Sequence, residues 1–279
     1  MRVSIIGLGL IGGSIAIALR ENHFAVNISG VDRNHVHAKK ALELNLVDKI
    51  ISLDEAIVNS DLIIVAIPVD ATAAILPGIL DKIKDAIVMD VGSAKDVICK
   101  AISDHPNRKN FVATHPMWGT EFSGPSAAVK GAFKNKAAVI CNVMQSDTKA
   151  VSIVESIYQL LGMHIIYMDA AAHDIHTAYI SHVSHITSFA LANTVLEKEK
   201  EDKTIFELAS GGFESTVRLA KSNPEMWLPI FKQNKDNVLD VLNEHITQLK
   251  KFKACLEKEN FEYLAELMEY ANTIKRILK

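Results

Sequence analysis

The amino-acid sequence predicts an α/β fold in which a doubly wound parallel sheet is followed by an all-α region. Up to about residue 169, short apolar runs rich in β-branched residues alternate with helical patterns. These runs are continuous and do not alternate with polar residues, which is typical of strands buried on both faces between layers of helices. Beyond residue 170 only helical periodicity remains. A chain of 279 residues is long enough for two domains, which we expect at residues 1–169 and 170–279.

The strands follow one another at short intervals in the first region. The run RVSIIG (residues 2–7) predicts the first strand, and a helix follows it through about Arg20. Equivalent β-branched, apolar runs predict further strands at residues 27–32, 61–69, 86–92, 110–116, 136–143 and 164–169.

The second region shows three helical segments. Residues 173–200 have the pattern of one long helix. Asn223 and Pro224 form an N-cap followed by proline at the first helical position, and apolar residues recur at helical spacing from there to Leu256. Asn260 is placed to cap a last helix. Apolar stripes of this kind need a partner surface, so we expect a homodimer.

Composition excludes several classes of protein. The net charge is −3, which leaves no basic footprint for nucleic acid. The three cysteines are far apart in the sequence and form no CxxC pair, which favours a reduced, cytoplasmic protein. Beyond the opening segment there is no apolar run of the ~20 residues that a membrane span needs, so no membrane partner is expected.

The opening segment, residues 3–19, admits two interpretations. It is almost entirely apolar, and Ala16-Ile17-Ala18 resembles the site at which signal peptides are cut. However, Arg2 is the single charge before it, which is too little for the basic start of a signal peptide. We therefore interpret the segment as a strand, a glycine turn and the start of a helix.

The glycine turn has the spacing of a dinucleotide-binding fingerprint. Gly7, Gly9 and Gly12 form G-x-G-x-x-G after an apolar strand and at the start of a helix, as in Rossmann-type domains. Asp32 ends the second strand, where a carboxylate accepts hydrogen bonds from the ribose hydroxyls and repels a 2′-phosphate. NAD is therefore the expected cofactor, and the neighbouring Arg33 leaves NADP open. The cofactor contacts are predicted at Gly7, Gly9, Leu10, Ile11, Gly12, Asp32, Arg33, Ile67 and Pro68.

Chemistry is expected at the carboxyl ends of the strands, where doubly wound sheets bind their ligands. The segments 67–72, 90–95 and 114–124 fall there. His115 leaves a strand end for a glycine-containing loop, and an imidazole there can take a proton from an alcohol near neutral pH. Ser93 can bond to the same hydroxyl; its purely structural alternative is to cap a helix that starts at Ala94.

Several motifs together resemble one family. DVGSAK (90–95), HPMWGTEFSG (115–124), SHVSH (181–185) and SGGFESTVRLAKSNPEMW (210–227) occur in this order. They resemble the bacterial prephenate dehydrogenases, the TyrA family of tyrosine biosynthesis, over nearly the whole chain. The resemblance implies a Rossmann domain followed by a helical dimerisation domain.

The resemblance also implies a reaction and the residues that serve it. Prephenate and NAD⁺ would give 4-hydroxyphenylpyruvate, CO₂ and NADH, with aromatisation driving the decarboxylation so that no metal is needed. His115 would accept the hydrogen bond of the substrate hydroxyl, with Ser93 orienting it, and Arg218 would hold a substrate carboxylate. The remaining pocket residues would be His185, Thr120, Glu121, Ser181, Gly211 and Trp227.

One departure from the family pattern and several alternatives remain open. Some family members have an aspartate at the position of Ser215, where this chain offers Glu214 one place earlier. His182 and His185 share a helix face but lack further ligands at convincing spacing, so no metal site is expected. Arogenate or broad cyclohexadienyl dehydrogenase is the first alternative function. A hydroxy-acid dehydrogenase that uses Lys221 or Lys232, or a non-catalytic NAD-sensing protein, are others.

Overall fold

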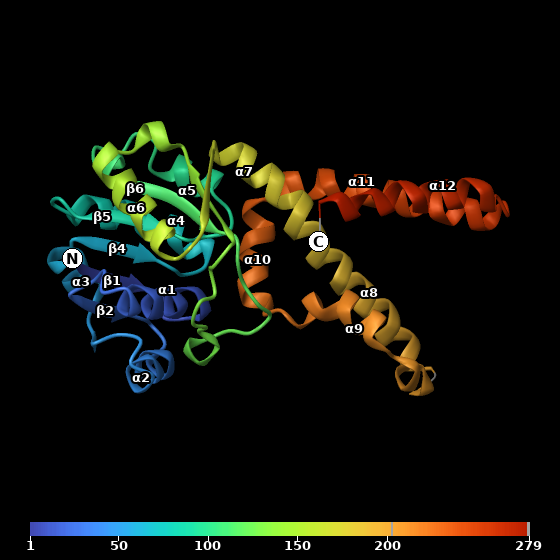
Figure 1. The fold of residues 1–279 in the computed structure, drawn as a ribbon, viewed down its shortest axis with the longest axis horizontal. Helices are drawn as coiled ribbons and strands as arrows, with labels where there is room; N and C mark the ends of the chain where they lie inside the picture. The colour runs from blue at the N-terminus through green and yellow to red at the C-terminus, as the bar shows by residue number, and fades with distance from the viewer. Residues whose placement is uncertain (202, 278–279) are drawn as a thin grey trace.

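The computed structural model describes residues 1–201 and 203–277, which form a layered α/β region and a helical region beside it (Figure 1). The α/β region contains an eight-stranded sheet in the order β3-β2-β1-β4-β5-β6-β7-β8. The predicted α/β class followed by helices is confirmed. The strands are β1 (Arg2–Ile6), β2 (Asn27–Val31), β3 (Lys49–Ile50), β4 (Leu62–Val65), β5 (Ile87–Asp90), β6 (Phe111–Pro116), β7 (Ala137–Cys141) and β8 (His164–Met168).

The sheet departs from the prediction at one edge. All neighbouring strands from β3 through β2, β1, β4 and β5 to β6 are parallel. Strand β7 runs antiparallel to β6, and β8 is parallel to β7. The chain leaves β6 at Pro116 and enters β7 at Ala137 through a loop that contains no crossover α-helix. It therefore returns along the neighbouring position in the opposite direction. Strand β3 is only two residues long, too short for a recognisable sequence pattern.

The sheet is buried on both faces, as its continuous apolar runs predict. Neighbouring residues of one strand pack into different cores: Ile5 of β1 faces one core and Ile6 faces the other. The first core lies under α1 (Leu10–Glu21), α2 (His35–Glu43) and α6 (Thr148–Leu160). The second lies under α3 (Leu53–Asn59), α4 (Val69–Lys82) and α5 (Asp96–Ala101).

The helical region joins the second core through α10 (Pro224–Gln233), whose Trp227 and Ile230 are buried there. Asn223 caps α10 by accepting the N–H of Glu225, with Pro224 at the first helical position, as predicted. Asn260 caps the last helix, also as predicted, by accepting the N–H of Tyr263. The other helices are α7 (Ala170–Thr177), α8 (Val183–Glu199), α9 (Gly211–Val217), α11 (Lys235–Glu257) and α12 (Phe261–Asn272), and the 3₁₀ turns are Arg108–Asn110, Pro125–Ala127, Val143–Gln145, Lys203–Leu208, Arg218–Lys221 and Thr273–Arg276.

Two helices predicted as single units are interrupted. The helix predicted over residues 173–200 consists of α7, a π-helical segment at Ala178–His182, and α8. The pattern that runs to Leu256 is divided at Asn234, where α10 ends and α11 begins in another direction (Figure 1). The buried Asn234 amide donates to the Asp174 carbonyl over 2.6 Å, and this contact fixes the bend. The spacing of apolar residues does not predict such interruptions. Segments of π-helix frequently occur at functional sites.

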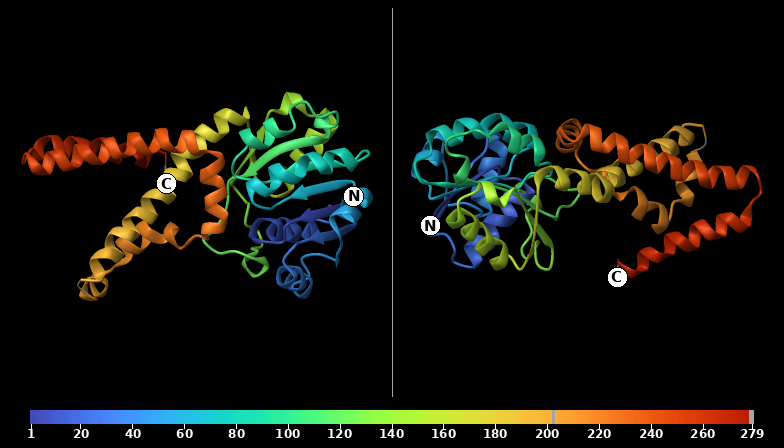
Figure 2. Two further views of the ribbon diagram at one scale, coloured as in Figure 1. Left: turned by 180° about the vertical axis from the view of Figure 1, so that it is seen from behind. Right: turned by 90° about the horizontal axis from the view of Figure 1, so that it is seen from above.

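The helical region projects away from the sheet as two arms, one formed by α8 and α9 and the other by α11 and α12 (Figure 2). Helix α12 has no buried residue. Among residues 1–201 and 203–277, no helix combines the length and the apolar character required to cross a membrane.

Candidate active site

The glycine fingerprint lies where the strand order reverses, between the carboxyl ends of β1 and β4, which is the point at which doubly wound sheets form their ligand crevice. Gly7 has φ +95°, and a Cβ there would lie 2.4 Å from the Ala66 carbonyl oxygen. A Cβ on Gly12 would lie 2.0 Å from the Gly7 carbonyl oxygen, so the turn and helix α1 need glycine for close packing. A Cβ on Gly9 would meet nothing within 4 Å. The backbone at Gly9 therefore faces open space, as a cradle for a pyrophosphate requires.

Asp32 is held against this turn. Its two carboxylate oxygens accept the N–H of Leu8 over 2.9 Å and the N–H of Asn34 over 2.8 Å. The carboxylate is half-buried at the end of β2, beside the opening of the crevice, whereas Arg33 is exposed. Leu10 and Ile11 form the first turn of α1, and Ile67 and Pro68 lead from β4 into α4 on the other side of Gly7. The residues predicted to contact the cofactor thus lie near the carboxyl ends of β1, β2 and β4.

A buried lysine lies beneath the carboxyl ends of β5 and β6. Lys95 and Asp90 are fully buried and form an ion pair, and the Lys95 ammonium also donates to the Thr114 carbonyl over 2.7 Å. Thr114 in turn donates to the Asp90 carbonyl over 2.5 Å. A buried charge pair persists where hydrogen bonds satisfy it on several sides. The pair thus fixes the two strand ends that carry Ser93 and His115.

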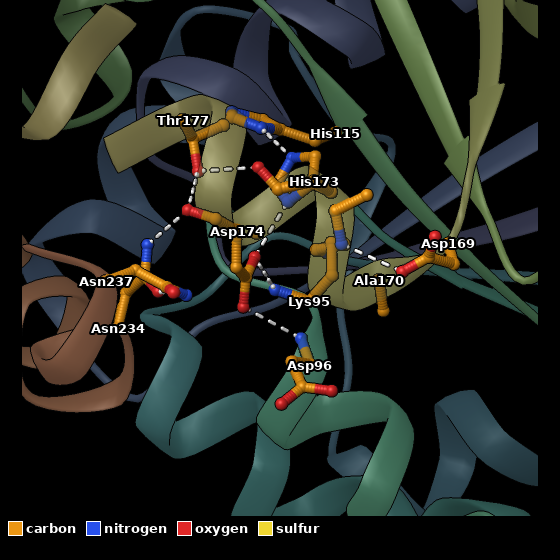
Figure 3. A network of polar contacts seen from close by, with 12 residues as sticks. Lys95, Asp96, His115, Asp169, Ala170, His173, Asp174, Thr177, Asn234 and Asn237 are labelled. Carbon is orange, nitrogen blue, oxygen red and sulfur yellow. Dashed lines mark hydrogen bonds and ion pairs between the residues drawn. The ribbon is translucent and has the colours of Figure 1, made fainter. Parts of the chain in front are cut away.

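His115 forms a chain of ring contacts with helix α7 (Figure 3). Its Nδ1 lies 2.9 Å from Nε2 of His173, and His173 Nδ1 lies 2.7 Å from the Asp174 carboxylate. Burial lowers the pKa of His115 well below its usual value, and the charges of His173, Lys95 and His182 add to this. Burial also lowers the pKa of His173, against the raising effect of Asp174. Both imidazoles are therefore neutral at physiological pH.

Ser93 is half-buried in the segment between β5 and α5. The alternative of Ser93 as an N-cap is wrong, because α5 begins at Asp96 and not at Ala94. The N–H groups of Lys95 and Asp96 instead donate to the Asp174 carboxylate over 2.8 and 2.9 Å. A carboxylate from the helical region thus caps the helix that follows Ser93, so Ser93 is free of the capping role.

His185 and Trp227 form a stacked pair at the wall formed by α8 and α10. Their ring centroids are 3.5 Å apart, and His182 meets the same indole edge-on at 5.8 Å. His185 Nδ1 lies 3.0 Å from the Ser181 carbonyl, so this nitrogen donates and Nε2 stays free to accept. Burial lowers the pKa of His185, and burial lowers the pKa of His182 to about 4. Trp227 lies in the core and its buried Nε1 has no partner among the described residues.

Arg218 reaches the loop that follows His115. Its guanidinium donates to the Glu121 carboxylate over 3.1 Å while half of its side chain stays exposed. The pKa of Glu121 lies below its usual range because its own backbone N–H donates to the carboxylate and Arg218 is near. Thr120 accepts the N–H of Phe122 in the same loop. Gly211 is exposed at the start of α9, and the Ser215 hydroxyl, one turn later, donates to the Gly212 carbonyl within the same helix and not to the loop.

Asp90, Lys95, His173, Asp174 and Asn234 also belong to the site, although the sequence motifs did not select them as functional residues. Asp90 and Lys95 belong to the DVGSAK segment itself, so charge within an apolar strand end was the available clue. Nothing in the local pattern singles out Asp174 or Asn234. Among residues 1–201 and 203–277, no three His, Cys, Asp or Glu side chains gather in a way that could hold a metal ion.

Comparison with known proteins places this geometry in a family. The model of the prephenate dehydrogenase nucleotide-binding domain matches residues 15–167, and that of the prephenate dehydrogenase dimerization domain matches residues 169–270. The Bacillus subtilis protein named prephenate dehydrogenase is 33% identical over 96% of this chain and 73% of its own length. The Zymomonas mobilis cyclohexadienyl dehydrogenase is 29% identical over 99% of this chain and 96% of its own.

A solved structure agrees over the whole length. The prephenate dehydrogenase of Aquifex aeolicus, in complex with hydroxyphenyl propionate and NAD⁺, superposes with a TM-score of 0.91 at 28% identity, covering 100% of this chain and 98% of that one. The four motifs at residues 90–95, 115–124, 181–185 and 210–227 fall inside the matched segments, whereas the glycine fingerprint at residues 7–12 precedes the first of them. The chain therefore belongs to the prephenate dehydrogenase family.

Proposed function

We propose that the protein oxidises and decarboxylates prephenate to 4-hydroxyphenylpyruvate with NAD⁺ as the hydride acceptor. The observation that carries the proposal is a neutral histidine, His115, at the carboxyl end of β6. This strand lies two positions along the sheet from β4, which borders the glycine fingerprint. The open backbone at Gly9 and the Asp32 carboxylate fit a dinucleotide with free ribose hydroxyls. Gly7, Gly9, Leu10, Ile11, Gly12, Asp32, Arg33, Ile67 and Pro68 are the proposed cofactor residues.

The mechanism follows from the state of His115. Bound at the glycine turn and Asp32, NAD⁺ would supply the acceptor for the hydride that leaves C4 of the cyclohexadienol. His115 accepts the proton of the C4 hydroxyl at its unprotonated ring nitrogen, so that the C4–O bond becomes a carbonyl. The ring carboxylate then leaves as CO₂, its bonding electrons restore the aromatic ring, and the oxygen is reprotonated to the phenol. Ser93 orients the hydroxyl from the neighbouring strand end.

Substrate binding falls to the residues from the helical region and the loop. Prephenate is a dianion and needs cationic partners. The Arg218 guanidinium uses one nitrogen for Glu121, and its other N–H groups can donate to a substrate carboxylate. His185 presents Nε2 from its stack on Trp227, with Ser181, Thr120 and Gly211 as the other proposed wall residues. These residues come from both regions, and we propose a division into domains at residues 169 and 170.

Activity on arogenate is the second candidate. Arogenate has an ammonium group where prephenate has a keto group, and the Glu121 carboxylate could pair with that ammonium. The similarity to a cyclohexadienyl dehydrogenase supports the same candidate. Steady-state rates of NADH formation should be measured with both substrates. A kcat/KM for prephenate at least tenfold above that for arogenate is expected, and equal or inverse values would overturn the first assignment.

The described part of the chain also supports a homodimer. Helix α12 buries none of its residues, yet it exposes Phe261 at 61% and Met268 at 56%, which lie seven residues apart on one face of the helix. An exposed apolar face of this extent is typical of a subunit interface. Light scattering at micromolar concentration should give twice the mass of one chain, and a monomer would contradict the proposal. The three free, buried cysteines support a reducing, cytoplasmic location.

A further inference from the structure

We propose that His173 and Asp174 are positioning residues that fix the tautomer of His115, so that His115 Nε2 faces the substrate hydroxyl without a proton. The inference deepens the proposed function and rests on it. It follows from the direction of each hydrogen bond in the chain that joins the two histidines to the carboxylate (Figure 3).

The direction is set at the Asp174 end. Its carboxylate oxygens accept backbone N–H groups from Lys95 and Asp96, and a carboxylate has no proton to offer His173. His173 Nδ1 is therefore the donor in its 2.7 Å contact with Asp174. A neutral imidazole carries one proton, so His173 Nε2 is an acceptor.

The direction of the next hydrogen bond determines which nitrogen of His115 carries the proton. Since His173 Nε2 accepts, His115 Nδ1 must donate across the 2.9 Å contact. The single proton of neutral His115 is then on Nδ1, which leaves Nε2 with a free lone pair. Without the partner, either nitrogen of His115 could hold the proton, and the molecules protonated on Nε2 would lack the acceptor.

Asp174 is itself held from three elements, so the chain has little freedom to invert. The backbone N–H groups of Lys95 and Asp96 satisfy its carboxylate, and its carbonyl accepts the Thr177 hydroxyl over 3.2 Å and the Asn234 amide over 2.6 Å. His173 and Asp174 are each 1% exposed, so water does not compete for these bonds. Because Lys95 is two residues beyond Ser93, the same carboxylate also fixes the segment that carries Ser93.

The first test is Asp174→Asn. The Asn carbonyl can satisfy only one side of the original carboxylate, and turning its amide towards His173 makes His173 Nδ1 an acceptor. His173 Nε2 then donates to His115 Nδ1, and the proton of His115 moves to Nε2. An inverted tautomer of this kind costs up to about 10⁴-fold in kcat in a serine-protease triad. We expect kcat to fall by roughly 10²–10⁴-fold with KM for prephenate and Kd for NAD⁺ changed less than about threefold.

A second variant pair separates positioning from a general structural role. In a His115→Asn background the added Asp174→Asn should lower kcat no further, since both act through one nitrogen. A further loss equal to that in the native background would overturn the proposal. His176→Asn, at an exposed position on the same helix, is the matched control and should retain native kcat. Melting temperatures of all variants report whether each remains folded.

The direct readout is the ¹⁵N spectrum of the His115 ring in the NAD⁺-bound, full-length protein at neutral pH. We expect a protonated Nδ1 and an unprotonated Nε2 in the native protein, and the reverse in Asp174→Asn. A native His115 protonated on Nε2 would overturn the inference even if Asp174→Asn proved too unstable to study. This readout needs no turnover, so failure of the tautomer is distinguishable from failure of the prephenate assignment.

Discussion

The nucleotide end and the substrate end of the site are built in different ways. At the nucleotide end, six consecutive positions from Gly7 to Gly12 place the backbone, and the limits are steric. At the substrate end, side chains from β6, α7, α8 and α10 and the loop to Glu121 meet, and the limits are protonation and hydrogen-bond direction. The first end is continuous in the sequence, whereas the second exists only because two regions of the chain pack together.

The difference predicts which changes each end tolerates. A backbone cradle is sensitive to added atoms but indifferent to pH, since it carries no titrating group of its own. A cluster of buried, neutral histidines is sensitive to loss of a proton acceptor and to acid. The variants below separate the two ends by whether they change turnover, cofactor affinity, substrate affinity or stability.

His115→Asn should have the largest effect. An amide cannot take the hydroxyl proton, so kcat should fall by roughly 10²–10⁴-fold, the usual contribution of a general base. The Kd of NAD⁺, measured by fluorescence titration, should stay within about twofold because the crevice is intact. Native kcat in this variant would show that His115 is not the base, whereas NAD⁺ binding without any NADH formation by the native protein would favour the non-catalytic, NAD-sensing alternative.

Gly12→Ala should act at the other end alone. Its Cβ would lie 2.0 Å from the Gly7 carbonyl, and moving the turn costs roughly 1–3 kcal/mol, so the Kd of NAD⁺ should rise by about 10–100-fold. Gly78→Ala is the matched control, since a Cβ at Gly78 meets nothing within 4 Å. If the two variants bound NAD⁺ equally, the steric account of the fingerprint would be wrong.

Arg218→Gln should weaken substrate binding more than turnover. Loss of a charge-assisted bond to the carboxylate, worth roughly 1.5–3 kcal/mol, should raise the KM for prephenate by about 10–100-fold. Lys221, which pairs with Glu214 at 3.8 Å on the same turn, provides the control. Lys221→Gln should leave KM within twofold, and a large loss of kcat there would instead support the hydroxy-acid dehydrogenase alternative.

The smallest effect concerns acid stability. The pKa of His182 is about 4 in the folded protein and roughly 6.5 when unfolded, so between these values the unfolded chain binds the extra proton. Stability is therefore present above about pH 6.5 and is lost as the pH falls towards 4. From pH 7 to 5.5 the His182 contribution is about 1 kcal/mol. Urea unfolding should show His182→Gln losing less than the native protein over this interval, and His176→Asn losing the same.

Much of the nucleotide end follows from local sequence. The strand–glycine–helix order there, like the caps at Asn223 and Asn260 in the helical region, depends on residues within one or two turns of each other, whereas Asp32 lies 24 positions from the Leu8 N–H that it accepts. These features depend on interactions between residues that are close in the sequence, so the spacing of the residues predicts the local structure. The interruptions at residues 178–182 and at Asn234 do not, because tertiary hydrogen bonds outweigh a helical pattern that continues across them.

The substrate end was only half predictable. His115, His185 and Arg218 were selected by motif, but their partners were not, since His115 and His173 are 58 positions apart and Lys95 and Asp174 are 79 apart. The antiparallel entry of β7 likewise depends on which edge of the sheet the loop after Pro116 returns to. The sequence by itself determined the buried strands, the nucleotide turn and the family. Tertiary structure decided which ring nitrogen of His115 bears the proton, because hydrogen-bond direction depends on a partner that only folding brings within 3 Å.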